Sequence, residues 1–136
     1  MILIDTGPLV GLINPRDAFY AKSRADLQTI SAHPLIVTVP VLTETFHLLR
    51  VERARLKLRE LLSKFNVAIQ DISQSTITAT LDWMHDYADH QPDFADAVTV
   101  VLSFEIKSAS VWTYDKEFHD IWRRPDGSAI PMAIRD

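Results

Sequence analysis

Residues 2–8 read Ile-Leu-Ile-Asp-Thr-Gly-Pro, so a short aliphatic run meets a carboxylate and then two turn-forming residues. This pattern predicts a buried strand over residues 2–4 that ends in a turn at Asp5–Pro8. Residues 110–115, Ser-Val-Trp-Thr-Tyr-Asp, repeat the same order of residue types and end at Asp115. The sequence therefore predicts two strands that are each followed by a carboxylate.

Helical and strand patterns alternate along the rest of the chain. Apolar runs predict strands at 35–39 and 67–69, and a last edge strand at 129–134. The spacing of Phe19, Ala25, Leu27 and Ile30 predicts an amphipathic helix over 17–32 with these residues inward, and apolar residues predict another helix over 93–107. Pro40 is expected to open a helix that either continues into residues 50–64 or breaks there. A further helix is expected from the capping residues Asp71 and Ser73 to Ala88.

Alternating strands and helices indicate an α/β fold whose central, mainly parallel sheet is covered by helices on both faces. A length of 136 residues suits one domain spanning residues 1–136. Hydrophobic residues make up 47% of the chain and charged residues 24%, which is typical of globular proteins and not of disordered ones.

The composition also narrows the class of chemistry and the compartment. The chain has no cysteine, which excludes disulfides, thiolate zinc sites and a cysteine nucleophile, and which suits the reducing cytoplasm. Its apolar runs are far shorter than the roughly 20 residues of a membrane helix. The first residues also lack the basic leader of a signal peptide. We therefore expect a cytoplasmic protein without a membrane anchor.

The net charge is unevenly distributed. The formal charge is −4, which alone argues against a general nucleic-acid binder. Residues 50–64 carry six basic and two acidic side chains, a local charge of +4, and removing that +4 from the total leaves −8 for the rest. One face of an otherwise acidic protein could therefore be basic. The alternative is an ordinary solvated helix face above packed leucines.

Carboxylates are expected to gather at one edge of the sheet, because ligands in open α/β folds bind beyond the carboxyl ends of the strands. Asp5 and Asp115 follow strands, Glu44 and Asp96 lie one turn past Pro40 and Pro92, and Asp93 lies three residues before Asp96. At about 5 Å and an effective dielectric near 20, each pair of charges costs roughly 3 kcal/mol. Protons or cations must relieve that repulsion. Each acid also has a purely structural reading, as a turn former or as a helix-capping acid.

An all-oxygen ligand set without His or Cys favours Mg²⁺ or Mn²⁺ over zinc. Such ions bridge carboxylates and a substrate phosphate, and they lower the pKa of a water so that it can attack. The pattern of acids therefore points to metal-assisted phosphoryl chemistry.

Four blocks of sequence, in order and across nearly the whole chain, resemble the PIN-domain ribonucleases, and in particular the VapC-like toxins of prokaryotic toxin–antitoxin pairs. The blocks are Ile4-Asp5-Thr6-Gly7-Pro8-Leu9-Val10, Pro40-Val41-Leu42-Thr43-Glu44, Asp93-Phe94-Ala95-Asp96-Ala97 and Thr113-Tyr114-Asp115-Lys116-Glu117-Phe118. Any one of them is unspecific, whereas the four together are a strong signal.

The resemblance implies a PIN-like three-layer α/β/α sandwich and a Mg²⁺- or Mn²⁺-dependent endoribonuclease, a homodimer that a cognate antitoxin neutralises. It implies an acidic catalytic and metal-binding site formed by Asp5, Glu44, Asp96 and Asp115. Asp93 matches an extra, supporting acid, and Thr6 and Thr113 fall where small hydroxyl residues accompany the first and last acids. Glu117 departs from the Asp found in many relatives, which leaves its role open.

Several side chains could contact RNA in such a protein. Backbone contacts could come from the basic stretch, with Arg50, Arg53 and Arg55 as the candidates, and from Arg123–Arg124. The tryptophans Trp83, Trp112 and Trp122 could stack on bases, although packing in the core or at a dimer interface is favoured for all three.

Three other functions match parts of the sequence. A non-catalytic PIN-like module that binds RNA or protein is the main alternative. Asp5-Thr6-Gly7 also resembles the catalytic triplet of aspartic proteases, but that fold is all-β and this chain has several helical segments. Glu44 and His47 have the spacing of a di-iron ligand pair, but only one copy occurs and the strand patterns argue against a helix bundle.

Overall fold

The computed structural model describes residues 1–135, which fold around one four-stranded sheet. The strands lie in the order β3-β2-β1-β4, and every neighbouring pair is parallel. The prediction of an α/β fold with a mainly parallel sheet is therefore confirmed. The strands are β1 (Ile2–Ile4), β2 (Leu35–Thr38), β3 (Ala68–Gln70) and β4 (Ser110–Trp112).

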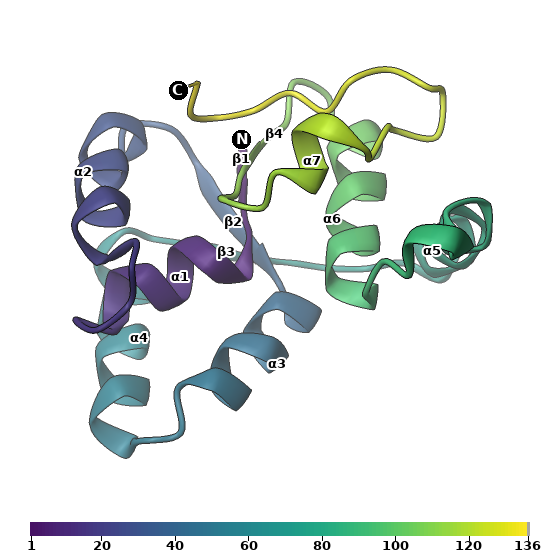
Figure 1. Ribbon diagram of the computed structural model, residues 1–136. Coiled ribbons are helices and arrows are strands. Elements are labelled where there is room, and N and C mark those ends of the chain that lie inside the picture. The colour runs from purple at the N-terminus through teal and green to yellow at the C-terminus, as the bar shows by residue number, and fades with distance from the viewer. Residues whose placement is uncertain (136) are drawn as a thin grey trace.

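Helices cover both faces of the sheet (Figure 1), which gives the three layers expected from the sequence. One group lies on the side of α1 and the other on the side of α6. The first group is α1 (Thr6–Ile13), α2 (Tyr20–Ile30), α3 (Val39–Leu48) and α4 (Glu52–Lys64). The second is α5 (Gln74–Asp86), α6 (Phe94–Glu105) and α7 (Glu117–Asp120), with a short 3-10 helix η1 (Ala88–His90) after α5.

Two apolar cores separate these layers, because side chains alternate between the two faces of a strand. Ile2 and Ile4 of β1 pack with Leu9 of α1 and Leu58 of α4. Leu3, between them, joins the second core against residues of α6 such as Val98. Strands that are buried on both faces read as continuous aliphatic runs, as β1 and β2 do.

The turn expected at Asp5–Pro8 is wrong, because α1 begins at Thr6 directly after Asp5. Gly7 and Pro8 are strong turn residues, but Pro8 is the third residue of the helix. The first N–H groups of a helix have no partner within it, so a proline in the first turn loses no hydrogen bond.

The helix that contains Pro40 ends before the basic stretch instead of continuing into it. α3 ends at Leu48 and α4 starts at Glu52, so the basic stretch forms a separate helix. Helix α2 also starts later than expected, at Tyr20 instead of residue 17. The reason is an Asp17 side chain that accepts a hydrogen bond from the Phe19 N–H (2.9 Å) and so holds a turn before the helix.

The edge strand expected at 129–134 is reduced to one bridge, between Val111 of β4 and Met132. The Val111 N–H donates to the Pro131 carbonyl and the Ala133 N–H donates back to Val111, both at 2.8 Å. Pro131 has no N–H to extend the ladder. Within residues 1–135 no helix combines the length and hydrophobicity needed to cross a bilayer.

Candidate active site

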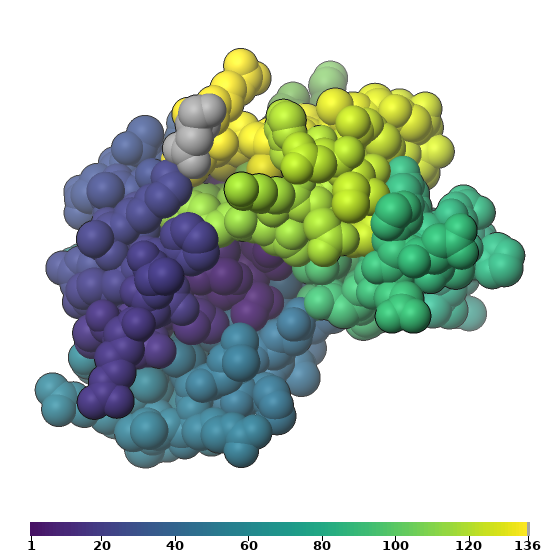
Figure 2. Space-filling model, in the orientation of Figure 1, coloured from purple at the N-terminus to yellow at the C-terminus, as the bar shows by residue number. Residues whose placement is uncertain are grey.

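The carboxyl ends of β1 and β4 lie side by side at the point where the order of strands reverses. The chain passes from β1 to β2 and β3 on one side and returns to β4 on the other. Such switch points leave room for ligands beyond the strand ends. Figure 2 shows a hollow here, with the N-terminal segment as its floor and with α2, α3, α6 and the segment around α7 surrounding it.

Thr113 joins the first and last predicted acids. Its hydroxyl donates a 2.7 Å hydrogen bond to Oδ2 of Asp5 and accepts one of 3.0 Å from the Asp115 N–H. The Asp5 N–H in turn donates to the Trp112 carbonyl at 2.9 Å. The Asp5 side chain makes no capping hydrogen bond to α1, which argues against a purely turn-forming role. Asp115 does accept a hydrogen bond from the Glu117 N–H, 2.9 Å away, and thereby starts α7.

The other acids come from the first turns of two helices. Asp93 caps α6 by accepting a 2.8 Å hydrogen bond from the Asp96 N–H, so its predicted structural reading is correct. Thr38 caps α3 by accepting one from the Val41 N–H, and the half-buried Glu44 follows on the same helix. Pro40 lies in the first turn of α3, as the sequence predicts.

The electrostatics show that Asp96 lies close enough to the other four acids for each of them to raise its pKa. Burial raises the pKa of Asp96 to about 9, with further increases from Asp5, Asp93, Asp115 and Glu44. Burial also raises the pKa of Asp5, which is 5% exposed, to about 6, with smaller contributions from Asp115 and Asp93 and opposing ones from Thr113 and Thr6. The pKa of Glu44 is raised by burial, Asp93 and Asp5.

The main influences on the pKa values of Asp5, Glu44 and Asp96 include no Lys or Arg side chain. The cleft therefore gathers negative charge that protons or cations from solution can neutralise. The Thr6 hydroxyl is also buried without a hydrogen-bond partner of normal geometry, although its interaction with Glu44 lowers the pKa of that carboxyl.

The donor set suits a hard divalent cation, because it consists of carboxylate and hydroxyl oxygens. Among residues 1–135, no three acidic or histidine side chains stand close enough together to hold a metal ion in their present positions. An ion held by three or more of these carboxylates would therefore require side-chain rotation that brings them together.

The structure does not bring Arg50, Arg53 or Arg55 into this cleft. Arg55 donates to the carbonyls of Leu49 (2.7 Å) and Phe46 (2.9 Å), and so fastens the end of α3 to α4. Arg50 donates to the His47 carbonyl at 3.2 Å. Arg53 is exposed and lines a separate groove of about 420 Å³.

The structure buries the three tryptophans as predicted but leaves Phe19 exposed. Trp83, Trp112 and Trp122 are at most 3% exposed, so the prediction of core packing is confirmed. Phe19, which the sequence places in the core, is instead 40% exposed and stacks on Tyr114. The sequence contains a signal for this exposed position. An Asp two residues before Phe19 can accept a hydrogen bond from its N–H and hold a turn before the helix starts.

The PIN domain family model matches residues 2–123, so the chain belongs to the PIN domain family. Among solved structures, it is similar to the crystal structure of Mycobacterium tuberculosis VapC20, described as a sarcin–ricin loop cleaving toxin. The TM-score is 0.68 at 20% identity, over 86% of this chain and 92% of that one. No curated protein matched the chain. The predicted family and its three-layer fold are confirmed.

Proposed function

We propose that this chain is a divalent-metal-dependent endoribonuclease that hydrolyses RNA phosphodiester bonds as the toxin of a toxin–antitoxin pair. The observation that supports this most strongly is the pKa of Asp96, raised to about 9 by burial and by four other carboxyls. A fold has no structural reason to gather charges that destabilise it, whereas a cation site requires them.

Asp5, Glu44, Asp96 and Asp115 would hold Mg²⁺ or Mn²⁺, with Asp93 in support. A bound divalent ion supplies an acidified water as nucleophile and stabilises negative charge on the phosphate and on the leaving oxygen. The residues themselves prepare the site. Thr113 fixes the orientation of the Asp5 carboxylate, and the Asp93 cap fixes the turn from which Asp96 projects.

The protonation state of Asp96 follows from its burial among other carboxyl groups. With a pKa of about 9, Asp96 carries a proton at neutral pH when no cation is present. Loading with a divalent cation releases that proton, because metal ligands must be deprotonated. The metal-free cleft is thus partly neutralised by protons, and cations replace them.

RNA is the proposed substrate. We propose a homodimer and a cognate antitoxin as partners in the cytoplasm. A groove of about 570 Å³ between α3, α4 and β3 is lined by the exposed apolar Phe46, Leu56 and Ile69. Its charged side chains are the basic Arg55 and Arg59 and the acidic Glu52, so basic residues outnumber acidic ones. Its composition suits an apolar antitoxin segment that carries acidic residues.

The test compares RNA cleavage by the wild type, Asp96→Asn and Asp82→Asn with Mg²⁺, with Mn²⁺ and with chelator. Asp82 is an exposed acid on α5 and serves as the matched control. We expect cleavage by the wild type and Asp82→Asn with either metal, none with chelator, and none by folded Asp96→Asn. Cleavage in chelator, or undiminished cleavage by Asp96→Asn, would contradict the proposal. RNA binding without any cleavage would favour the non-catalytic module.

A further inference from the structure

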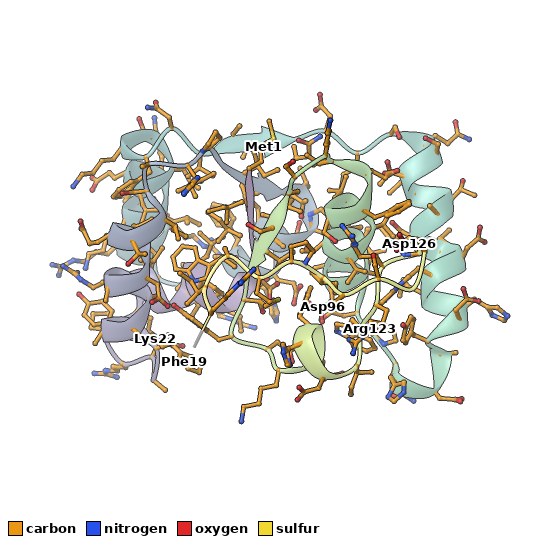
Figure 3. All side chains as sticks on the ribbon, turned by 90° about the horizontal axis from the view of Figure 1, so that it is seen from above. Met1, Phe19, Lys22, Asp96, Arg123 and Asp126 are labelled. Carbon is orange, nitrogen blue, oxygen red and sulfur yellow. The ribbon has the colours of Figure 1, made fainter. Side chains whose placement is uncertain are left out.

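Phe19 forms an exposed aromatic surface beside the acidic cleft. Its ring lies 4.6 Å from the ring of Tyr114, at an interplanar angle of 25°, and Tyr114 directly precedes Asp115. One face of Phe19 is covered by this stack while the side chain stays 40% exposed. In Figure 3, Phe19 and Lys22 lie on one flank of Asp96, and Arg123 lies on the other.

Hydrogen bonds hold the backbone around Phe19 in place. Its N–H donates to Asp17, and its carbonyl accepts from the N–H (2.8 Å) and the hydroxyl (2.6 Å) of Ser23. Gly11 of α1 permits this close approach, because a Cβ there would lie 2.8 Å from the Ser23 hydroxyl and 3.2 Å from the Phe19 carbonyl.

The ring behind Phe19 is fixed as well. The Tyr114 hydroxyl donates to Asp26 at 2.7 Å and accepts from the Trp112 indole N–H at 3.2 Å. The Lys22 ammonium lies 5.4 Å from the centre of the Tyr114 ring and 3.2 Å from Asp26. The two-ring stack is therefore tied to α2 and to β4, and it carries a cation at its side.

A rigid exposed ring is well suited to stack on a nucleobase, since little conformational freedom is lost on binding. The cleft itself is acidic, so attraction for RNA must come from its rim. We propose that a base of single-stranded RNA stacks on Phe19 next to the acidic cleft, with the Lys22–Asp26 ion pair beside it. This inference rests on the proposed function for its choice of RNA as the ligand.

Single-stranded RNA is favoured over duplex RNA, because the bases of a duplex are already stacked on both faces. Exposed aromatic residues are ordinary on protein surfaces, so a matched control is needed. Phe104 provides it: it is 44% exposed near the C-terminal end of α6, whereas Asp96 lies in the first turn of that helix.

The test measures binding of a 5′-fluorescein-labelled oligoadenylate by fluorescence anisotropy. All proteins carry Asp96→Asn, so that RNA is not cut, and thermal melting checks their folding. Phe19→Ala and Phe19→Leu should each weaken binding about 5- to 150-fold, which corresponds to the 1–3 kcal/mol of one stacked base. Leu keeps apolar packing against Tyr114 but has no aromatic face. Phe19→Trp should restore binding, and Phe104→Ala should leave it unchanged.

The inference is contradicted if Phe19→Leu binds the oligoadenylate as tightly as the parent, or if Phe104→Ala weakens binding equally. It is also contradicted if an RNA duplex of the same length shows the same dependence on Phe19. These readouts do not require cleavage. Loss of the proposed nuclease function alone would leave the Phe19 effect in place, and normal metal-dependent cleavage without a Phe19 effect would overturn only this inference.

Discussion

The Thr113 hydroxyl donates a 2.7 Å hydrogen bond to the buried Asp5 carboxylate, across 108 positions of sequence. The contact exists because β1 and β4 are neighbours in the sheet, with Ile4 paired to Trp112. The same hydroxyl accepts a hydrogen bond from the Asp115 N–H. A single side chain thus fixes the relative positions of the first and last acids of the site.

Replacing Thr113 by Val should weaken both folding and cleavage. Val has nearly the same shape but removes the hydroxyl that donates to Asp5 and accepts from the Asp115 N–H, which costs about 1–3 kcal/mol of unfolding free energy. It also removes an interaction that lowers the pKa of Asp5. Urea unfolding and RNA cleavage would measure the two effects. Thr113→Ser keeps the hydroxyl and should stay close to the wild type, so equal losses in Val and Ser variants would refute this role.

The metal-free protein should lose stability as pH rises. The folded-state pKa of Asp5 (about 6) and that of Asp96 (about 9) both lie above the ordinary value of 3.8. The native state therefore binds more protons than the unfolded state between pH 4 and 9, and its unfolding free energy falls across that window. Asp5 contributes up to about pH 6 and Asp96 up to about pH 9.

The matching variant is Asp96→Asn, which cannot ionise. In chelator at pH 8 it should be more stable than the wild type by several kcal/mol and have a higher Tm, since each pKa unit above the ordinary value is worth about 1.4 kcal/mol. The gap should close toward pH 4. Thermal melting in buffers of equal ionic strength would measure this. If the variant is less stable than the wild type at pH 8, the folded state does not disfavour the ionised form of Asp96.

Divalent cations should raise the melting temperature of the wild type, because a ligand that binds only the native state stabilises it by mass action. The gain is about 2.7 kcal/mol at a concentration of 100 times the Kd. Melting curves with Mg²⁺ or Mn²⁺, against NaCl of equal ionic strength, would show it. An equal response in Asp96→Asn would place the binding elsewhere on the protein.

Substitution of Arg55 should lower the stability of the protein more than substitution of Arg53, because only the Arg55 side chain holds two helices together. Arg55→Ala removes two hydrogen bonds to carbonyls at the end of α3 and should cost about 1–3 kcal/mol. The exposed Arg53→Ala should stay within about 0.5 kcal/mol of the wild type. Chemical unfolding would measure both. If the two variants lose equal stability, the contacts of Arg55 do not hold α3 to α4.

Local patterns in the sequence predict much of the fold and fail where tertiary context decides. Buried parallel strands such as β2 are visible as aliphatic runs, and Pro40 marks the start of α3 correctly. Gly7 and Pro8 mislead, because their turn-forming character is harmless in the first turn of a helix. Phe19 misleads as well, since helical spacing alone does not reveal that α2 starts only at Tyr20, the residue after Phe19.

The candidate site was predictable only in part. Each acid could be placed at a strand end or a helix start, but its neighbours depend on the strand order β3-β2-β1-β4, which no local pattern encodes. The family resemblance implied that Asp5, Glu44, Asp96 and Asp115 form one site, but it gave no strand order. The bridging hydrogen bonds of Thr113 and the large rise in the pKa of Asp96 depend on packing and burial, so they required the structure.

A crystal structure grown with Mn²⁺ tests the central claim most directly, because anomalous scattering locates the ion independently of any assay. We expect an anomalous peak within bonding distance, about 2.2 Å, of carboxylate oxygens of Asp5 and Asp96. The same crystals of Asp96→Asn should show a weaker peak or none. A well-ordered cleft without an anomalous peak at saturating Mn²⁺, or an ion bound only at other residues, would contradict the account.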